Sequence, residues 1–354
     1  MKRRLKKKPI IILIVILLPI IIYNYSISSV SNKSEEVIFE VQEGSTYSSL
    51  VNDLKEQNLI RSELFYKIYI KLNNPNLLQA GTYKLNRNMN LKELISVLGK
   101  GSTTSKDNIN ITFKEGINMR SIVKQIVNNT EISEEEIYNK LKDENYLNKI
   151  IKKYWFLDEV IKNNKIYYSL EGYLFPDTYE VNRKGNIEEI FNVMLNNMER
   201  KLEPYKEDIL KSEYSVHEIL TLASIIEMEA ANSNDRVGVA GVFYNRLNSG
   251  WSLGSDVTTY YGIKVDVSER DLYQTEIDTY NDYNTRHNKM AGKLPISPIC
   301  IPSIESIKSS INPTKHNYYY FVADKNKKTY FFKTYNEHVS KISELKRNGL
   351  WYEY

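Results

Sequence analysis

Cysteine is almost absent from this 354-residue chain, and its one cysteine, Cys300, excludes an intrachain disulfide and therefore a disulfide-stapled fold. Glycine and proline are also scarce, with 14 and 9 residues, while aromatic residues reach 12%, so collagen-like and disordered chains are excluded. The four histidines are scattered without metal-ligand spacing, and no GxSxG, Walker or GxGxxG motif occurs. A zinc enzyme, a serine hydrolase and a nucleotide-binding protein have no support, and we expect neither a cofactor nor a metal.

An excess of positive charge is confined to the amino terminus, where six of the first eight residues are Lys or Arg and no acidic residue precedes Glu35. Without these six, the 48 basic residues become 42 against 44 acidic ones, which is a net charge of −2. The body of the protein is therefore not a polybasic nucleic-acid binder, and we expect no nucleic-acid partner.

Residues 9–23 form a run without a charge or an amide, and Tyr25 and Ile27 can extend it. A helix needs roughly 17–25 apolar residues to span a bilayer, so we predict an uncleaved transmembrane anchor over residues 9–27. The positive-inside rule makes residues 1–8 a cytoplasmic tail of a single-pass protein of the cell membrane, with everything that follows on the outer side. A cleaved signal peptide is the alternative, although Ser26-Ile27-Ser28 is a poor cleavage site.

The outer part divides at a glycine-rich stretch that ends at Thr104. We predict a linker over residues 28–38, a small module over 39–104 and a larger part over 105–354. A strand–turn–helix pattern opens the module and recurs about 72 residues later, at the start of the larger part. The module resembles the LysM-like glycan-binding fold, and a purely structural role for it is the alternative.

Helical and strand patterns alternate locally in the larger part, without βαβ regularity. The stretch from Ser133 to Tyr168 is helical, residues 317–332 predict a hairpin with a polar turn, and a last helix follows over 336–347. Together with the module, these patterns predict the α+β class.

Glu227 is the strongest candidate for chemistry. It follows a helical pattern that begins with a capping box at Ser215 and Glu218 and that is mostly apolar. Burial raises the pKa of a carboxyl and keeps it protonated near neutral pH, as a general acid requires. Glu229 lies about 200° around the same helix, so the two carboxyls cannot work side by side. The structural alternative is that Glu227 ends the buried face and pairs with an arginine, either Arg236 or Arg246.

Several motifs in order resemble the YceG-like (MltG) family of endolytic murein transglycosylases. They lie at residues 170–179 (LEGYLFPDTY), 222–229 (LASIIEME), 239–247 (VAGVFYNRL), 253–256 (LGSD), 283–285 (YNT) and 320–323 (YFVA). The resemblance covers residues 39–350. It implies a LysM-like module followed by a mixed α+β YceG-like catalytic domain.

The resemblance implies a lyase reaction on peptidoglycan. The family cuts the MurNAc-β-1,4-GlcNAc bond inside glycan strands without water and leaves 1,6-anhydro-MurNAc ends. Its catalytic glutamate falls on Glu227, which would protonate the leaving oxygen and then take a proton from the muramic 6-hydroxyl. An intramolecular nucleophile needs no second carboxylate to position water.

Other motif positions are candidate substrate-binding residues. They are Glu171, Tyr173, Asp177, Ser224, Glu229, Asn245, Asp256 and Asn284. Glu171 and Asp177 bracket an aromatic turn, and carboxylates and aromatic rings suit sugars. We expect Glu229 to support the site rather than to act as the acid. For the turn, the alternative is internal packing with Asp177 as a cap, and for Asn245, Asp256 and Asn284 it is a structural hydrogen bond.

Two departures from the family pattern affect the site. The stretch over residues 286–303 is longer and has fewer glycines, and the closing hairpin has Thr329 or Tyr330 where a histidine is common.

From the predicted anchor and the resemblance together, we expect a membrane-anchored lytic transglycosylase that ends the elongation of nascent strands beside the cell-wall synthesis machinery. The main alternative is a non-catalytic peptidoglycan-binding or division scaffold, and a third is an unrelated surface enzyme for another polysaccharide.

Overall fold

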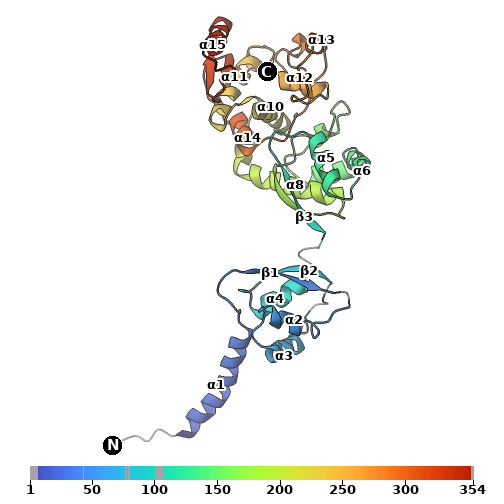
Figure 1. Ribbon diagram of the computed structural model, residues 1–354, viewed down its shortest axis with the longest axis vertical. Coiled ribbons are helices and arrows are strands. Elements are labelled where there is room, and N and C mark those ends of the chain that lie inside the picture. The colour runs from blue at the N-terminus through green and yellow to red at the C-terminus, as the bar shows by residue number, and fades with distance from the viewer. Residues whose placement is uncertain (1–6, 43, 76–77, 79, 100–106, 352–354) are drawn as a thin grey trace, which may run out of the picture. The chain divides into compact units, whose positions relative to one another are not determined.

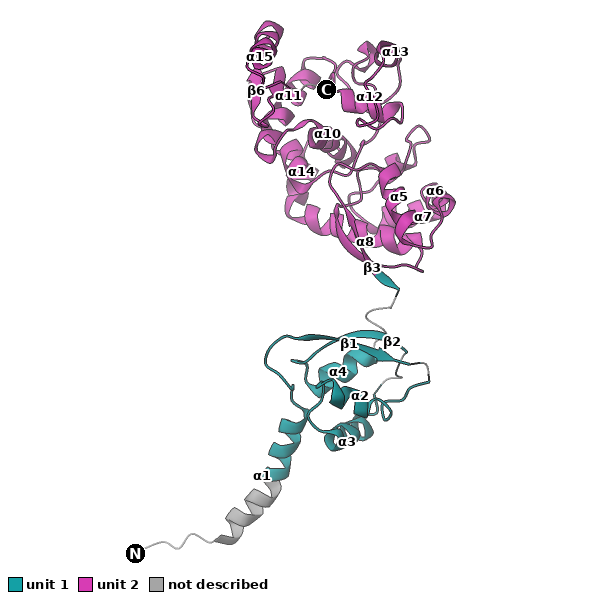
Figure 2. Ribbon diagram, in the orientation of Figure 1, with its two compact units in different colours: residues 1–108 teal, residues 109–354 magenta. Residues whose placement is uncertain are grey.

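The protein is described by a computed structural model that covers residues 7–42, 44–75, 78, 80–99 and 107–351. The chain forms two compact units, residues 1–108 and residues 109–354, which Figure 2 colours separately. Over these described residues the fold is mostly helical, and the strands form three two-stranded sheets. This mixed architecture confirms the predicted α+β class.

The first helix, α1 (Lys7–Ile27), coincides with the predicted membrane anchor over residues 9–27 (Figure 1). The side chains of residues 7–16, and residues 1–6 altogether, lie outside the described part of the chain. Among the described residues, no helix combines the length and the apolar character that a membrane span requires. The anchor and the cytoplasmic tail over residues 1–8 stay predictions.

The first unit contains one antiparallel sheet and three further helices. β1 (Glu36–Val41) pairs with β2 (Gly81–Asn86), so that Glu36 lies opposite Asn86 and Val41 opposite Gly81. The helices are α2 (Val51–Glu56), α3 (Glu63–Asn73) and α4 (Leu91–Leu98). Their buried side chains make a core of this unit's own, which includes Phe39, Leu54, Tyr66, Tyr83 and Leu94. The LysM-like character of this unit stays a prediction.

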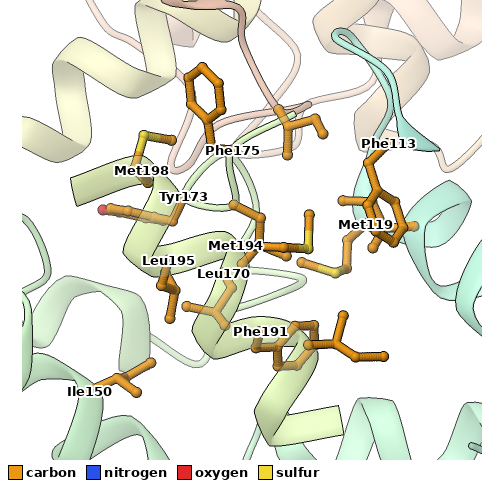
Figure 3. Packing of buried hydrophobic residues seen from close by; sticks show 14 of the residues in the cluster. Phe113, Met119, Ile150, Leu170, Tyr173, Phe175, Phe191, Met194, Leu195 and Met198 are labelled. Atoms are coloured by element: carbon orange, nitrogen blue, oxygen red, sulfur yellow. The ribbon is translucent and has the colours of Figure 1, made fainter. Parts of the chain in front are cut away.

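At the start of the second unit, β3 (Asn108–Phe113), whose first residue is the last of the first unit, forms a sheet with β4 (Asp177–Asn182). The helices of this half are α5 (Met119–Asn129), α6 (Glu134–Lys140), α7 (Glu144–Lys153), α8 (Ile187–Leu202) and α9 (Lys206–Lys211), with short 3-10 turns at Glu159–Lys162 and Glu203–Tyr205. Figure 3 shows their core, where Leu170 and Tyr173 lie among the methionines of α8. The predicted helical stretch from Ser133 to Tyr168 is thus interrupted rather than continuous.

The rest of the second unit carries the motif helices. α10 (Val216–Glu229) packs against α11 (Arg236–Asn248) and α14 (Ile304–Ile311). The other elements are α12 (Asp256–Gly262), α13 (Gln274–Asp278), β5 (Tyr320–Ala323), β6 (Thr329–Phe332) and α15 (Tyr335–Arg347), with 3-10 turns at Ser233–Asp235 and Asn288–Met290. Strands β5 and β6 pair antiparallel, which confirms the predicted hairpin, and α15 confirms the last helix.

Candidate active site

Glu227 lies in the last turn of α10, whose first turn is fixed by the predicted capping box. Ser215 Oγ accepts a hydrogen bond from Glu218 N at 3.3 Å, and Glu218 Oε2 accepts one from Ser215 N at 2.8 Å. The following apolar residues are buried on almost every side of the helix. Only 7% of the Glu227 side chain is exposed, so the helix carries a carboxyl into a largely enclosed position.

Four donors converge on the Glu227 carboxylate. Arg236 Nη2 donates to Oε1 at 2.8 Å. Oε2 accepts hydrogen bonds from Ser303 N at 2.9 Å, from Ser306 Oγ at 2.7 Å and from Ser303 Oγ. Ser303 is the N-cap of α14, so the carboxylate also faces the positive end of that helix dipole. The pairing with Arg236, which the sequence offered as the structural alternative, therefore occurs.

These donors reverse the expected titration of Glu227. Burial raises the pKa of the carboxyl, but the hydrogen bonds from Ser303 and Ser306 and the charge of Arg236 together lower it below its ordinary value. The prediction that burial keeps Glu227 protonated near neutral pH is wrong. The carboxyl is an ionised group whose negative charge the surrounding donors stabilise.

The segment that precedes Ser303, residues 299–302, is hydrogen-bonded to two other parts of the chain. On one side, Ile299 N donates to Ser224 Oγ at 3.0 Å, and Cys300 Sγ donates to Ser224 O at 3.3 Å. On the other, Ile301 N donates to Ile117 O at 2.9 Å. The segment belongs to the stretch over residues 286–303 that departs from the family pattern, and its end supplies donors to Glu227.

A cavity of about 270 Å³ lies at the last turn of α10, where Met228, the residue after Glu227, is part of its lining. Gly116, Tyr261 and Asp266 also line this cavity. Gly116 has a φ of +79°, and a Cβ atom there would lie 3.3 Å from Met228 Sδ and 3.9 Å from Glu227 Cγ. Glycine thus allows this turn to approach the carboxylate closely.

Glu229 has separate surroundings. Ser255 Oγ donates to its Oε1 at 2.6 Å. Burial raises its pKa and Asp256 adds to the rise, while the Ser255 hydrogen bond and the charges of Arg246 and Arg286 oppose it. This arrangement agrees with the inference that the two glutamates do not form a side-by-side pair.

Glu171 and Tyr173 come from the aromatic turn but lie inside the protein. Both Glu171 oxygens accept hydrogen bonds from Met119 N at 3.0 Å, and Tyr261 Oη donates to Oε2 at 2.8 Å. Burial raises the pKa of Glu171 to about 7. Glu171 is thus hydrogen-bonded to Tyr261, which is part of the cavity lining. Tyr173 is 1% exposed and its Oη lies 2.8 Å from His217 Nδ1, so its ring is a core group.

The four remaining candidates do not gather around Glu227. Asn245 donates to the carbonyls of His316 and Tyr318. Asn284 is fully buried, and its amide donates to three backbone carbonyls between residues 276 and 279. Asp177 accepts a hydrogen bond from Asn197 Nδ2 at 3.0 Å. Asp256 is exposed and pairs with Arg286 at 2.8 Å. These placements favour the structural alternative for both asparagines.

Comparison with known proteins identifies the chain's relatives. The model of the YceG-like family matches residues 39–344. The endolytic murein transglycosylase of Bacillus subtilis (strain 168) is 35% identical over 306 residues, 85% of this chain and 82% of that protein. The protein of the same name from Streptococcus pneumoniae serotype 2 is 32% identical over 343 residues, 91% of this chain, which spans only 61% of that longer protein.

A solved structure agrees with these relationships. The crystal structure of a YceG-like protein from Listeria monocytogenes superposes with a TM-score of 0.61 at 29% identity, and the match covers 87% of this chain and 100% of that one. The resemblance that the ordered motifs indicate is therefore confirmed, and the chain belongs to the YceG-like family.

Proposed function

We propose that this protein is an endolytic murein transglycosylase that cuts peptidoglycan glycan strands at internal positions. The observation that carries the proposal is Glu227, at the motif position of the family's catalytic glutamate, with four donors on its carboxylate and a cavity that the next residue, Met228, lines. The printed names of the relatives, endolytic murein transglycosylase, support the same reaction class.

The proposed reaction breaks the MurNAc-β-1,4-GlcNAc bond in two proton transfers. The protonated Glu227 carboxyl gives its proton to the glycosidic oxygen as the bond from that oxygen to the anomeric carbon breaks. The muramic 6-hydroxyl then bonds to the anomeric carbon, and its proton passes to the Glu227 carboxylate. One bond breaks and one forms, water takes no part, and the acid is regenerated with a 1,6-anhydro end on the product.

The donors around Glu227 fit the middle of this cycle. After the first proton transfer the group is an anion, and Ser303, Ser306 and Arg236 stabilise that anion without rearrangement. In the free protein the same donors favour the ionised form, so only a minor fraction carries the proton at neutral pH. A glycan bound at Glu227 excludes water from the carboxyl and raises its pKa. The protonated fraction, which the first step needs, therefore increases.

The cellular role follows from the predicted anchor. A single-pass helix over residues 9–27 would hold the enzyme at the outer face of the cell membrane, where new glycan strands emerge. Cutting there ends the elongation of nascent strands and brings the enzyme beside the synthesis machinery. A LysM-like first unit would add a second contact with glycan.

One observation favours a second candidate, a non-catalytic peptidoglycan-binding scaffold. The ion pair of Glu227 with Arg236 is what a structural carboxylate at the end of a buried helix would form. In that case glycan binding would not depend on the acid function of Glu227.

The 354-residue chain in detergent micelles and its Glu227→Gln variant test the proposal on purified peptidoglycan. The amide cannot deliver a proton, so we expect internal cutting to fall by about 10²–10⁴-fold. The exposed Glu213 supplies a matched variant, Glu213→Gln, with unchanged cutting. Mass spectrometry identifies the end groups of the products and so distinguishes the possible reactions.

Each outcome indicates a different activity for this protein. Fragments with anhydro-muramic ends, one water lighter than hydrolytic products and absent with Glu227→Gln, support the transglycosylase. Reducing ends would instead mean a hydrolase that uses water. Glycan binding without any products, unchanged in Glu227→Gln, would establish the scaffold.

A further inference from the structure

A second and larger cavity lies in the same unit, and none of the predicted site residues lines it. Its volume is about 600 Å³. Three tyrosines and three lysines dominate its lining: Tyr138, Tyr167, Tyr168, Lys142, Lys162 and Lys264. Glu144 is the acidic residue among the lining groups. The cavity is therefore aromatic and positively charged.

The tyrosines form a rigid aromatic wall. The rings of Tyr138 and Tyr168 stack with centroids 5.7 Å apart and an angle of 23° between their planes. Tyr167 packs against Tyr283 at 4.6 Å and against Tyr261 at 5.9 Å, and its hydroxyl donates to Gly262 O at 2.8 Å. All three lining tyrosines are half-buried, so they are fixed by their neighbours and still present a surface. Such surfaces pack against methyl and methylene groups.

Two of the lysines are available to an anion. Lys142 and Lys264 are exposed, and within the described part of the chain neither forms an ion pair. Lys162 differs, because it donates to Asn148 Oδ1 at 2.9 Å and pairs with Glu159. The Lys264 ammonium lies 4.4 Å from the centroid of the Tyr167 ring, which places its charge at the aromatic wall.

The backbone at Lys264 is unusual for a lysine. Its φ of +59° is in the left-handed region, which glycine and asparagine favour and which costs another residue on the order of 1 kcal/mol. The conformation closes α12: Lys264 N donates to Tyr261 O at 3.0 Å and Val265 N donates to Tyr260 O at 3.1 Å, the pattern of a Schellman cap, which holds Lys264 in place beside the cavity that it lines.

The larger cavity borders the same stretch of backbone as the smaller cavity at Met228. Lys264 lines the larger cavity and Val265, the next residue, lines the smaller, so one stretch of backbone borders both. Consecutive Cα atoms are about 3.8 Å apart. The aromatic contact between Tyr167 and Tyr261 joins the same two walls. The loop at Lys264 and Val265 and one aromatic contact thus lie between the two cavities.

We propose that the larger cavity binds the stem peptide that muramic acid residues of a peptidoglycan strand carry, an inference that rests on the proposed function. A stem is a short peptide with several carboxylates and with small aliphatic side chains. Lys142 and Lys264 pair with the carboxylates, and the tyrosine wall packs against the aliphatic groups. The enzyme therefore selects strands that carry stems over strands from which the stems have been removed.

The test uses the 354-residue chain in detergent micelles and the double variant Lys142→Gln/Lys264→Gln. The matched control is Lys124→Gln/Lys152→Gln, which removes two exposed lysines of the same unit that do not line the cavity. Cutting is measured on glycan strands with stems and on strands stripped of them. Two partly exposed ion pairs predict that the KM for stem-bearing strands rises about fivefold in the double variant at low salt. Stripped strands should keep their KM, and the control variant should match the wild type.

Binding is also measured without cutting, by titrating a synthetic stem peptide into Glu227→Gln and into the same chain with the two lysine substitutions. Peptide binding that weakens about fivefold with the lysine substitutions supports the proposal even where no strand is cut, and that case would count against the proposed function alone. Equal KM values of the wild type for the two kinds of strand, an equal loss on both, or no peptide binding would overturn the proposal.

Discussion

Among single residues, Ser306 offers the most direct control over Glu227, because its hydroxyl donates to Glu227 Oε2 at 2.7 Å. Ser306→Ala removes one of the groups that lower the pKa of Glu227, so we expect that pKa to rise. If the protonated carboxyl is the active acid, the high-pH limb of the kcat/KM profile then moves to higher pH. The profile is measured with stem-bearing strands over pH 4–9.

Ser309 provides the comparison for this experiment. It is buried in the same helix, α14, and its hydroxyl donates to Glu305 O at 2.8 Å instead of to Glu227. Ser309→Ala should lose about 1 kcal/mol of stability and keep the wild-type pH profile. Identical profiles for Ser306→Ala and Ser309→Ala would refute the assignment of the limb to Glu227.

The sequence singles out Glu227 as the candidate acid but does not predict its ionisation state. Helical periodicity is local, so it located the carboxyl at the end of a buried helix and named Arg236, nine residues on, as a possible partner. The serine donors lie 76 and 79 residues away, and no local pattern connects them with α10. A serine just ahead of an apolar helical run is an N-cap signal that would have located Ser303 as the start of α14.

On the scale of elements, the site depends on how tightly the turn at Gly172 packs against the segment that leads to Ser303. Gly172 has a φ of +79°, and a Cβ atom there would lie 2.2 Å from Pro298 Cβ. Gly172→Ala combines a strained backbone with a steric clash, so we expect a loss of about 2–4 kcal/mol of stability. Because the clash displaces residues that precede Ser303, cutting should fall as well. Urea denaturation and the peptidoglycan digest measure the two effects.

Gly250→Ala separates strain from the clash. Gly250 also has a positive φ, +70°, but nothing lies within 4 Å of the added Cβ. We expect a loss of about 1 kcal/mol and unchanged cutting. If Gly172→Ala were no worse than Gly250→Ala, the close packing would not matter for the site.

Elements with a local signal were predicted well, and those defined by distant contacts were not. The capping box at Ser215, the hairpin of β5 and β6 and the last helix follow from periodicity and turn residues. The pairing of β3 with β4 joins strands more than 60 residues apart, and no pattern indicated it. Tyr173 and Asn284 belong to motifs, but both are buried: Tyr173 packs in the core, and Asn284 makes hydrogen bonds within a loop. A motif contains residues that maintain the fold as well as residues of the site, so membership alone does not predict a functional role.

At the scale of the whole second unit, Glu171 makes stability depend on pH. Its pKa is raised to about 7 by burial, so between its ordinary value of 4.5 and about 7 the folded protein binds more protons than the unfolded one. Stability therefore falls as the pH rises through this window. The amide of glutamine does not titrate, so Glu171→Gln should remove a difference of about 3 kcal/mol between pH 4.5 and pH 8.

Tryptophan fluorescence during urea denaturation can follow this effect, because all three tryptophans, Trp155, Trp251 and Trp351, belong to the second unit. Glu305→Gln, which changes an exposed glutamate, serves as the comparison and should keep the wild-type pH dependence. A Glu171→Gln protein with that same dependence would show that Glu171 is not the group responsible.

The burial of Cys300 has a practical consequence for spectroscopy. This single thiol is 1% exposed, donates to Ser224 O, and has a pKa that burial raises well above its ordinary value, so it does not react as a thiolate in the folded protein. A maleimide dye or a spin label then reaches only cysteines that are introduced at exposed positions. Two such cysteines, one in each unit, would report the distance between the units in solution without any change to the native sequence around Glu227.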